Sequence, residues 1–294
     1  MAHPQIAAFA RLAKENSRPT RLLAGQKTLL TRTMHDIRYD EMHDEFFVSN
    51  AFGQAIMVFR GGASGEEAPI RIIQGPRTQL EGSAYDGIDR LAVDPIHNEI
   101  LVPCVDSILV FPRDGNGDVA PLRIIRGPDT RIQGTQSVAV DPVHDLIIVG
   151  SRTAARDGEP EIDWRRGGLL ARGGALLIFN RTDNGNVRPR AIISGPKSGL
   201  TGAQVQIQTY PPKGWIVATR SSGNRNSDEQ ERVGYIALWS IADNGDVPPR
   251  WLIGGPQSML KGPRGVALNP RNKEILVTDS SLNAVLTFYF PEIF

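Results

Sequence analysis

The feature that most constrains this chain is a short extended segment that occurs five times. Each copy has a proline six residues before a glycine, with mainly aliphatic residues near the glycine. Self-similarity at spacings of 50 to 68 residues indicates a repeat architecture in which each copy belongs to one structural unit. The copies are RPTRLLAG (18–25), APIRIIQG (68–75), APLRIIRG (120–127), RPRAIISG (188–195) and PPRWLIGG (248–255).

A second pattern lies between these copies and completes the unit. It consists of an apolar strand, a tight turn containing Asp, Asn or Pro, and a second apolar strand, as in LAVDPIHNEILVPC (91–104). A third strand follows each time, and in three units a turn such as DGNG (114–117) leads into the repeated segment. The unit is therefore an antiparallel meander of four strands, A to D. Five units predict an all-β, five-bladed β-propeller, with the repeated segment as the outer strand D, where proline is tolerated.

The two ends of the sequence predict how the ring closes. The first strand D (18–25) has no strands A to C before it, and the last three strands (264–290) have no strand D after them. We therefore expect 18–25 to complete the fifth blade and close the ring without an open edge. Residues 18–294 would form a single propeller domain. Residues 1–17 would form an N-terminal helical extension, because Ile6, Phe9 and Leu12 have the spacing of a short amphipathic helix.

Composition and charge exclude several classes of function. The net charge is +1, so no overall field favours nucleic acid or an anionic membrane. Cys104 is the single cysteine, which excludes a disulfide framework, and we expect it to be a half-buried apolar residue. No apolar stretch is long enough for a membrane span, and the N-terminus lacks the pattern of a signal peptide. The chain as given is expected in the cytoplasm, or in the periplasm or outside the cell if a signal peptide was removed.

The stretch GVALNPRNKEILVTDSSLNAVLTF (265–288) resembles the NHL repeat and the related YVTN (YncE-like) propeller repeats. Their pattern is G-V-A-V-D-P, then I-Y-V-A-D, then N-x-I-x-V-F, and the similarity covers nearly the whole chain after residue 17. The resemblance implies a β-propeller. Relatives of this kind include protein- and RNA-binding modules, lactonase-like hydrolases and lyases, so the fold alone does not select a function. This chain departs from the best-known members in having five units, where six or more are usual.

Two rings of side chains are expected at one mouth of the central channel, where the D-to-A and B-to-C loops meet. The ring that precedes strand A is wholly polar, and it forms either a water-lined channel or a binding site. Its members are His35, Asp89, Gln136, Gln204 and Arg264. The ring that ends strand B consists of Asn50, Cys104, Ser151, Thr219 and Asp279.

Two long B-to-C insertions, 152–174 and 220–234, are expected on the same face. The first has mixed charges around a tryptophan, and Trp with Arg is favoured in protein interfaces, although a solvated, internally salt-bridged loop would look the same. The first hypothesis is therefore a non-enzymatic recognition or scaffold module that binds a protein or small molecule through this loop-rich face. Its expected contacts are Trp164, Arg165, Arg166, Gln136, Gln204 and Arg264.

An alternative hypothesis places chemistry at the same mouth. His35 between Asp89 and Asp279 could act as a general base for water attack on an ester or lactone, as in a lactonase-like hydrolase. Asp89, Asp279 and Asn50 also offer the oxygen ligands that a divalent cation such as Ca²⁺ prefers. No catalytic motif such as G-x-S-x-G, HExxH or a P-loop supports this alternative.

Three histidines occupy equivalent A-to-B turns in the first three blades: His43, His97 and His144. Imidazole binds zinc readily, so a ring of histidines raises the question of a metal site. Because each belongs to a different blade, we interpret them as one turn residue in repeated copies.

Overall fold

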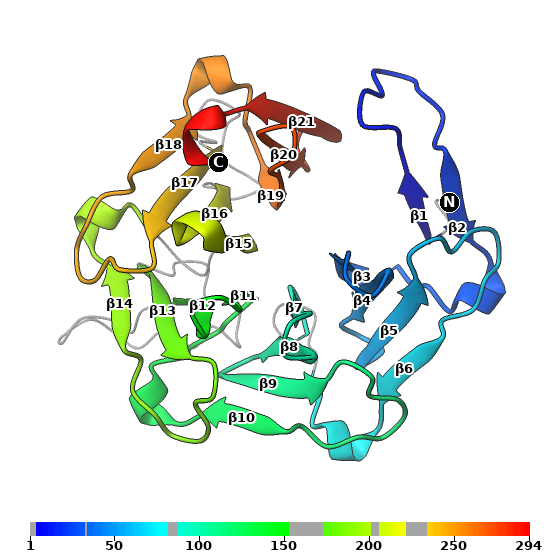
Figure 1. Cartoon of the computed structure of the whole chain (residues 1–294), viewed down its shortest axis with the longest axis horizontal. Coiled ribbons are helices and arrows are strands. Elements are labelled where there is room, and N and C mark those ends of the chain that lie inside the picture. Colours follow the sequence, from blue (N-terminus) through cyan, green and yellow to red (C-terminus); the bar gives the residue numbers. More distant parts are fainter. Residues whose placement is uncertain (1–3, 33, 82–87, 153–172, 201–205, 222–233) are drawn as a thin grey trace.

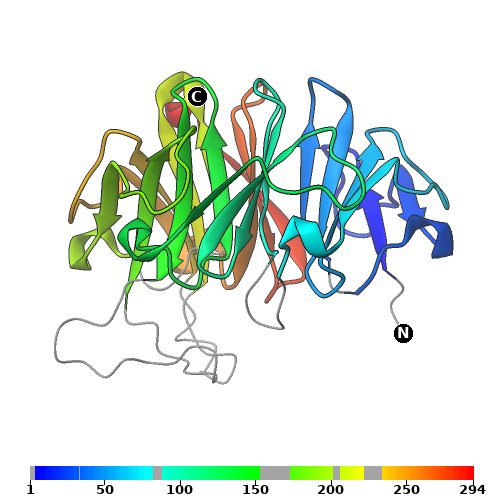
Figure 2. The ribbon, with the colours of Figure 1, turned by 90° about the horizontal axis from the view of Figure 1, so that it is seen from below.

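The computed structural model describes residues 4–32, 34–81, 88–152, 173–200, 206–221 and 234–294. Regular structure in this part of the chain consists of β-strands and short 3₁₀ turns. The antiparallel sheets are arranged around a common axis (Figure 1), and from the side their strands stand along that axis (Figure 2). The all-β architecture with five blades in a propeller arrangement is confirmed.

Four blades have four strands each, ordered A to D along the chain and across the sheet. In the fifth blade the structure describes three strands, A to C. The blades are β3 (Met34–Asp40), β4 (Glu45–Asn50), β5 (Ala55–Arg60) and β6 (Arg71–Gln74); β7 (Ala92–Asp94), β8 (Glu99–Cys104), β9 (Ser107–Pro112) and β10 (Arg123–Arg126); β11 (Ser137–Asp141), β12 (Leu146–Arg152), β13 (Gly174–Asn180) and β14 (Ala191–Ser194); β15 (Gln206–Tyr210), β16 (Trp215–Ser221), β17 (Gly234–Ser240) and β18 (Trp251–Gly254); and β19 (Pro263–Asn269), β20 (Glu274–Asp279) and β21 (Ala284–Tyr289).

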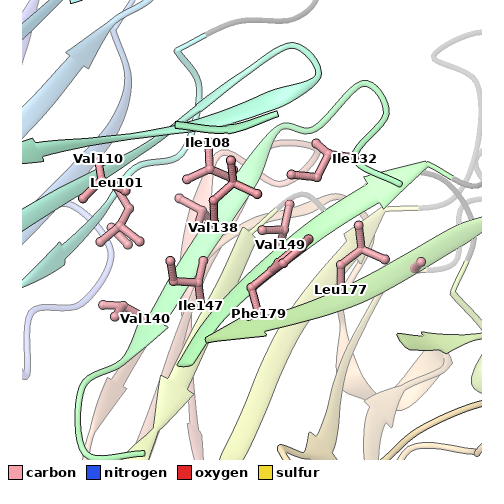
Figure 3. Close-up of a cluster of buried hydrophobic side chains, with 13 residues drawn as sticks. Leu101, Ile108, Val110, Ile132, Val138, Val140, Ile147, Val149, Leu177 and Phe179 are labelled. Carbon is pink, nitrogen blue, oxygen red and sulfur yellow. The ribbon is translucent and has the colours of Figure 1, made fainter. Parts of the chain in front are cut away.

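The hydrophobic core lies between neighbouring blades. Figure 3 shows one such layer, in which Leu101 and Val110 of the second blade meet Val138, Ile147 and Phe179 of the third. Apart from Ala92, Ile132 and Val140, the residues of this cluster are almost completely inaccessible to water. Each fully buried side chain of this size stabilises the fold by about 1.5–3 kcal/mol, so every blade depends on its neighbours.

The arginine of the repeated segment joins two blades. Arg71 in β6 makes two hydrogen bonds to the carboxylate of Glu45 in β4, at 2.9 and 2.6 Å, and Arg113 of the second blade binds the same carboxylate. Glu99 is held in the same way, by Arg123 of its own blade and Arg181 of the third. In the first two blades the repeated Arg is therefore the strand-D half of a charged clamp between blades, whereas Ala191 takes its position in the third blade. In the fourth blade Trp215 takes the position of the glutamate and Trp251 that of the arginine, and the two rings meet edge to face.

The three turn histidines each bind an aspartate of their own turn. His43 Nδ1 lies 2.7 Å from Asp40 Oδ2, while Asp40 Oδ1 accepts the backbone N–H groups of Met42 and His43. The same arrangement joins His97 to Asp94 and His144 to Asp141. These histidines therefore stabilise A-to-B turns on separate blades.

The N-terminal segment differs from the prediction. The expected helix within residues 1–17 is wrong, because β1 (Gln5–Ala8) is a strand that pairs antiparallel with β2 (Arg21–Ala24). The expected ring closure is wrong too, because β2 lies beside β1 and β21 pairs with β20 in the described chain. The two-stranded sheet lies between the first and fifth blades (Figure 1). A helix this short is marginal in water, whereas pairing with β2 satisfies the backbone groups of β1.

The β1–β2 sheet repeats the geometry of strands C and D. Phe9 precedes Gly25 by 16 residues, the same spacing as from Phe59 to Gly75 in the first blade. The pair Gln5–Ala24 has the same register, relative to these landmarks, as the pair Ala55–Gln74. The sheet also reaches the next blade in the same way, because Leu23 bridges Gly65 just as Ile73 bridges Gly117.

The contact with the fifth blade repeats as well. Arg11, two residues after Phe9, binds the carboxylate of Glu274 at the start of β20. Arg113 stands in the same position after β9 and binds Glu45 at the start of β4. The β1–β2 sheet therefore occupies a sixth position in the ring, as strands C and D of a blade.

Candidate functional site

A cavity of about 1050 Å³ runs along the propeller axis. Its walls come mainly from the A strands of the five blades, and it opens toward the sixth position, where Ile6 of β1 and Val285 of β21 line it. Charged and polar side chains gather where the A strands begin. They are His35, Asp36, Arg38, Arg90, Gln206 and Arg264.

Gln206 ties three blades together across this cavity. Its Nε2 donates a 3.0 Å hydrogen bond to Asp36 Oδ1 in the first blade, and its Oε1 accepts the backbone N–H of Val266 in the fifth. Arg38 Nε donates to Asp36 Oδ2 and to the carbonyl of Leu91 in the second blade, both at 2.8 Å. Because these partners lie on different A strands, the polar end of the cavity is pre-organised.

His35 and Asp89, which the sequence places in one ring, are in contact. His35 Nδ1 lies 3.1 Å from Asp89 Oδ1, and Arg90 Nη1 donates to Asp89 Oδ2 at 2.6 Å. Asp89 and Arg90 are almost fully buried, whereas the His35 side chain is 34% exposed. Asp89 Oδ1 has no hydrogen-bond partner in the described chain, so the imidazole faces the carboxylate at ion-pair distance on one side and is open on the other.

A local irregularity in the strands positions two of these side chains. The β3–β4 pairing shifts between Met34 and Asp36, which leaves His35 outside the regular ladder. The β19–β20 pairing shifts in the same place, between Pro263 and Gly265, which leaves Arg264 outside the regular ladder. Bulges of this kind re-aim a side chain, and here both affected residues line the cavity.

The charges at this end of the cavity favour an anion. Among the described residues at this end, three arginines (Arg38, Arg90 and Arg264) lie with two aspartates (Asp36 and Asp89), which is one positive charge more than negative. Burial raises the pKa of the Asp36 carboxyl, and nearby Arg38 and Arg90 oppose that rise. Protonation of Asp36 removes one negative charge and so makes the net charge at this end more positive.

The second ring anchors loops. Asp279 Oδ2 accepts the backbone N–H groups of Lys261 and Gly262, and its Oδ1 accepts those of Ser281 and Leu282. Ser151 Oγ accepts the N–H of Gln133, and Cys104 Sγ accepts that of Glu81. These bonds tie the end of strand B to the D-to-A loop. Burial raises the pKa of the Cys104 thiol, which is fully buried rather than half-buried as expected.

The remaining predicted site residues are distributed as follows. Gln136 accepts the backbone N–H of Arg90 through its carbonyl, and Asn50 Oδ1 accepts hydrogen bonds from Thr31 and Gly53. No contact in the described chain joins Asp279 to His35 or Asp89, so the structure brings together two members of the expected catalytic group. Trp164, Arg165, Arg166 and Gln204 lie outside the described residues.

The fourth blade requires a correction of one residue in the alignment. Ile207 pairs with Ala218 as Val138 pairs with Val149 in the third blade. The position that ends strand B in this blade is therefore Arg220, and not Thr219. Burial lowers the pKa of Arg220, which lies beside Tyr235.

The described residues contain no group of three or more His, Cys, Asp and Glu side chains placed to hold a metal ion. The candidate calcium ligands Asn50 and Asp279 use their oxygens to bind nearby donors in the loops. A calcium site at the mouth therefore stays a prediction. Within the same part of the chain, no helix is long and apolar enough to cross a membrane.

No protein-family model matches the chain, and no curated protein matches it in sequence. Among solved structures, the chain is similar to hydrazine synthase from Kuenenia stuttgartiensis, with a TM-score of 0.58 and 14% sequence identity. The match covers 92% of this chain and 67% of the other. At this identity, the likeness shows the propeller fold and carries no information on function.

Proposed function

We propose that this chain is a binding module that holds a small anionic molecule at the polar end of the axial cavity. The observation that carries the proposal is the convergence of Arg90, Arg264 and His35 on a cavity of about 1050 Å³. Ligand pockets of this kind are largely pre-formed and use a few polar groups to orient the ligand. The hydrogen bonds of Gln206 and Arg38 hold the polar end in place before any ligand arrives.

Melting experiments test this proposal with citrate, inorganic phosphate and a sugar phosphate as probes. A ligand that binds only the folded state at 100 times its Kd adds about 2.7 kcal/mol to stability. We expect at least one probe to raise the melting temperature, and we expect Arg264→Gln to abolish the rise. Arg188→Gln, on an exposed arginine of the C-to-D connection in the third blade, is the matched control and should retain the rise. No rise with any probe, or an equal rise in Arg264→Gln, would contradict the proposal.

A second candidate function is hydrolysis of an ester or lactone, favoured by the 3.1 Å contact between His35 and Asp89. An imidazole beside a carboxylate and open to the cavity can take a proton from water. This candidate expects turnover of p-nitrophenyl acetate or a simple lactone that His35→Gln removes. Unchanged turnover in that variant would exclude it. The same melting experiments with added Ca²⁺ or EDTA test the calcium hypothesis.

Two finer hypotheses belong with this proposal. The motif at 265–288 forms the three strands of the fifth blade, which supports kinship with the NHL and YVTN repeats. A protein partner that contacts Trp164, Arg165 and Arg166 on the loop-rich face would bind on the same side of the propeller as the anionic ligand. Loss of partner capture after replacing these three residues with alanine would support that contact, and retained capture would exclude it.

A further inference from the structure

The sixth position of the ring has strands C and D but neither A nor B in the described chain. Two side chains that face this position, one on each side of it, are exposed. Ile37 in β3 is 48% exposed, whereas its counterparts Leu91, Val138 and Ile207 are completely buried. In the complete blades this strand-A position packs against the preceding blade, as Leu91 does against Phe47, and the blade preceding β3 is the sixth position.

The fifth blade lies on the other side of the sixth position. Val285 in β21 is 62% exposed, whereas the equivalent Ile56, Ile108 and Ile236 are completely buried. The equivalent residues pack toward the next blade, which for β21 is again the sixth position. Ile37, Val285 and Ile6 line the same cavity, and we call this side of it the sixth-blade slot.

We propose that the sixth-blade slot docks one extended polypeptide run of the D–A–B type. Its strand B would pair with the free edge of β1, its strand A would cover Ile37, and its strand D would pair with β21. This arrangement continues the interfaces that already join the other blades, because β1 keeps the register and blade contacts of a strand C. Strand addition to a sheet edge is an established mode of peptide recognition.

Charge and topology define the occupant further. In the first two blades the strand-D arginine binds a glutamate at the start of strand B, as Arg71 binds Glu45 and Arg123 binds Glu99. Arg21 is the strand-D arginine of the sixth position and donates to the carbonyl of Gly61. The incoming strand B should therefore begin with a carboxylate that pairs with Arg21. A second copy of this chain is a poor occupant, because all five of its A–B pairs belong to its own blades.

The experiment uses a synthetic peptide of residues 71–104 with Cys104→Ser, a D–A–B run whose strand B begins with Glu99. Titration calorimetry should show one peptide bound per chain, and Ile37→Asp should weaken binding at least about tenfold, or 1.4 kcal/mol. Leu122→Asp alters a side chain of similar exposure, 55%, on the second blade and should bind as the wild type does. A peptide carrying Glu99→Lys should also bind more weakly.

Failure to bind the wild-type chain, or equal binding to Ile37→Asp, would overturn the proposal. Sedimentation of the chain alone supplies a second outcome: a dimer that Ile37→Asp dissociates would assign the slot to a second copy and also overturn it. Arg264→Gln lies at the polar end of the cavity and should leave peptide binding unchanged. The peptide result is therefore separable from the test of the anionic ligand.

Discussion

Replacing Trp239 with alanine is expected to lower the free energy of unfolding by about 4 kcal/mol. Trp239 is completely buried between the third and fourth blades, where it packs with residues of both sheets. Removing the indole would leave a cavity that two rigid sheets cannot close, so the lost contacts are not recovered. Chemical denaturation followed by circular dichroism measures the change.

Trp239→Phe is the matched control for that experiment. The equivalent positions in the first three blades are Phe59, Phe111 and Phe179, all completely buried, so the site accepts a phenyl ring. The Trp239 Nε1 also has no hydrogen-bond partner in the described chain, and phenylalanine removes that buried donor. We expect this variant to stay within about 1.5 kcal/mol of the wild type. Equal losses for both variants would show that the position does not depend on ring packing.

Glu99→Gln is expected to cost about 3 kcal/mol, because it leaves the largely buried Arg123 without its anion and leaves Arg181 with only the exposed Asp145. The Glu99 side chain is 8% exposed, and Arg123 and Arg181 both bind it. Asp145→Asn is the control, since Asp145 also binds Arg181 but is 63% exposed. A surface pair of that kind contributes less than about 1 kcal/mol. Similar losses in the two variants would contradict the assignment of the clamp to Glu99.

The same variant should change the pH dependence of stability. Burial alone would raise the pKa of Glu99, but hydrogen bonds and charge from Arg123 and Arg181 lower it below its usual value. A carboxyl whose pKa is lower in the folded state stabilises the fold above its unfolded pKa, and this contribution is lost as the pH falls through the folded value. The stability gap between wild type and Glu99→Gln should therefore narrow below about pH 4.5. A constant gap down to pH 2 would contradict this assignment.

The blades could be predicted from the sequence because period-two alternation, Asn-Gly turns and the Pro-to-Gly spacing all indicate the same strands. The N-terminus was mispredicted because Ile6, Phe9 and Leu12 fit a helical spacing over a segment too short to decide. The 16-residue spacing from Phe9 to Gly25 matches that from Phe111 to Gly127 and is the sequence signal for a C–D pair. A comparison of all five such spacings would have identified β1.

The site was predictable only in part. His35 and Asp89 could be placed together because they precede strand A in adjacent blades. Arg90 and Gln206 were missed, although each occupies the next position along its strand. Side chains of a strand alternate between its two faces, so these residues face the cavity while core residues such as Leu91 face the neighbouring blade. The particular backbone groups that Asp279 binds could not be predicted, because their positions depend on loop conformation.

The most direct measurement of the six-position ring is oxidative cross-linking from one shared cysteine, Ala24→Cys in β2. Paired with Gln5→Cys in β1, it joins direct cross-strand neighbours, whose separation suits a disulfide. Paired instead with Ala284→Cys in β21, it would cross-link only if β2 closed the fifth blade as its strand D. The account predicts a disulfide in the first double variant and none in the second. A disulfide in the second would show a closed five-position ring, without the sixth-blade slot and with a smaller axial cavity.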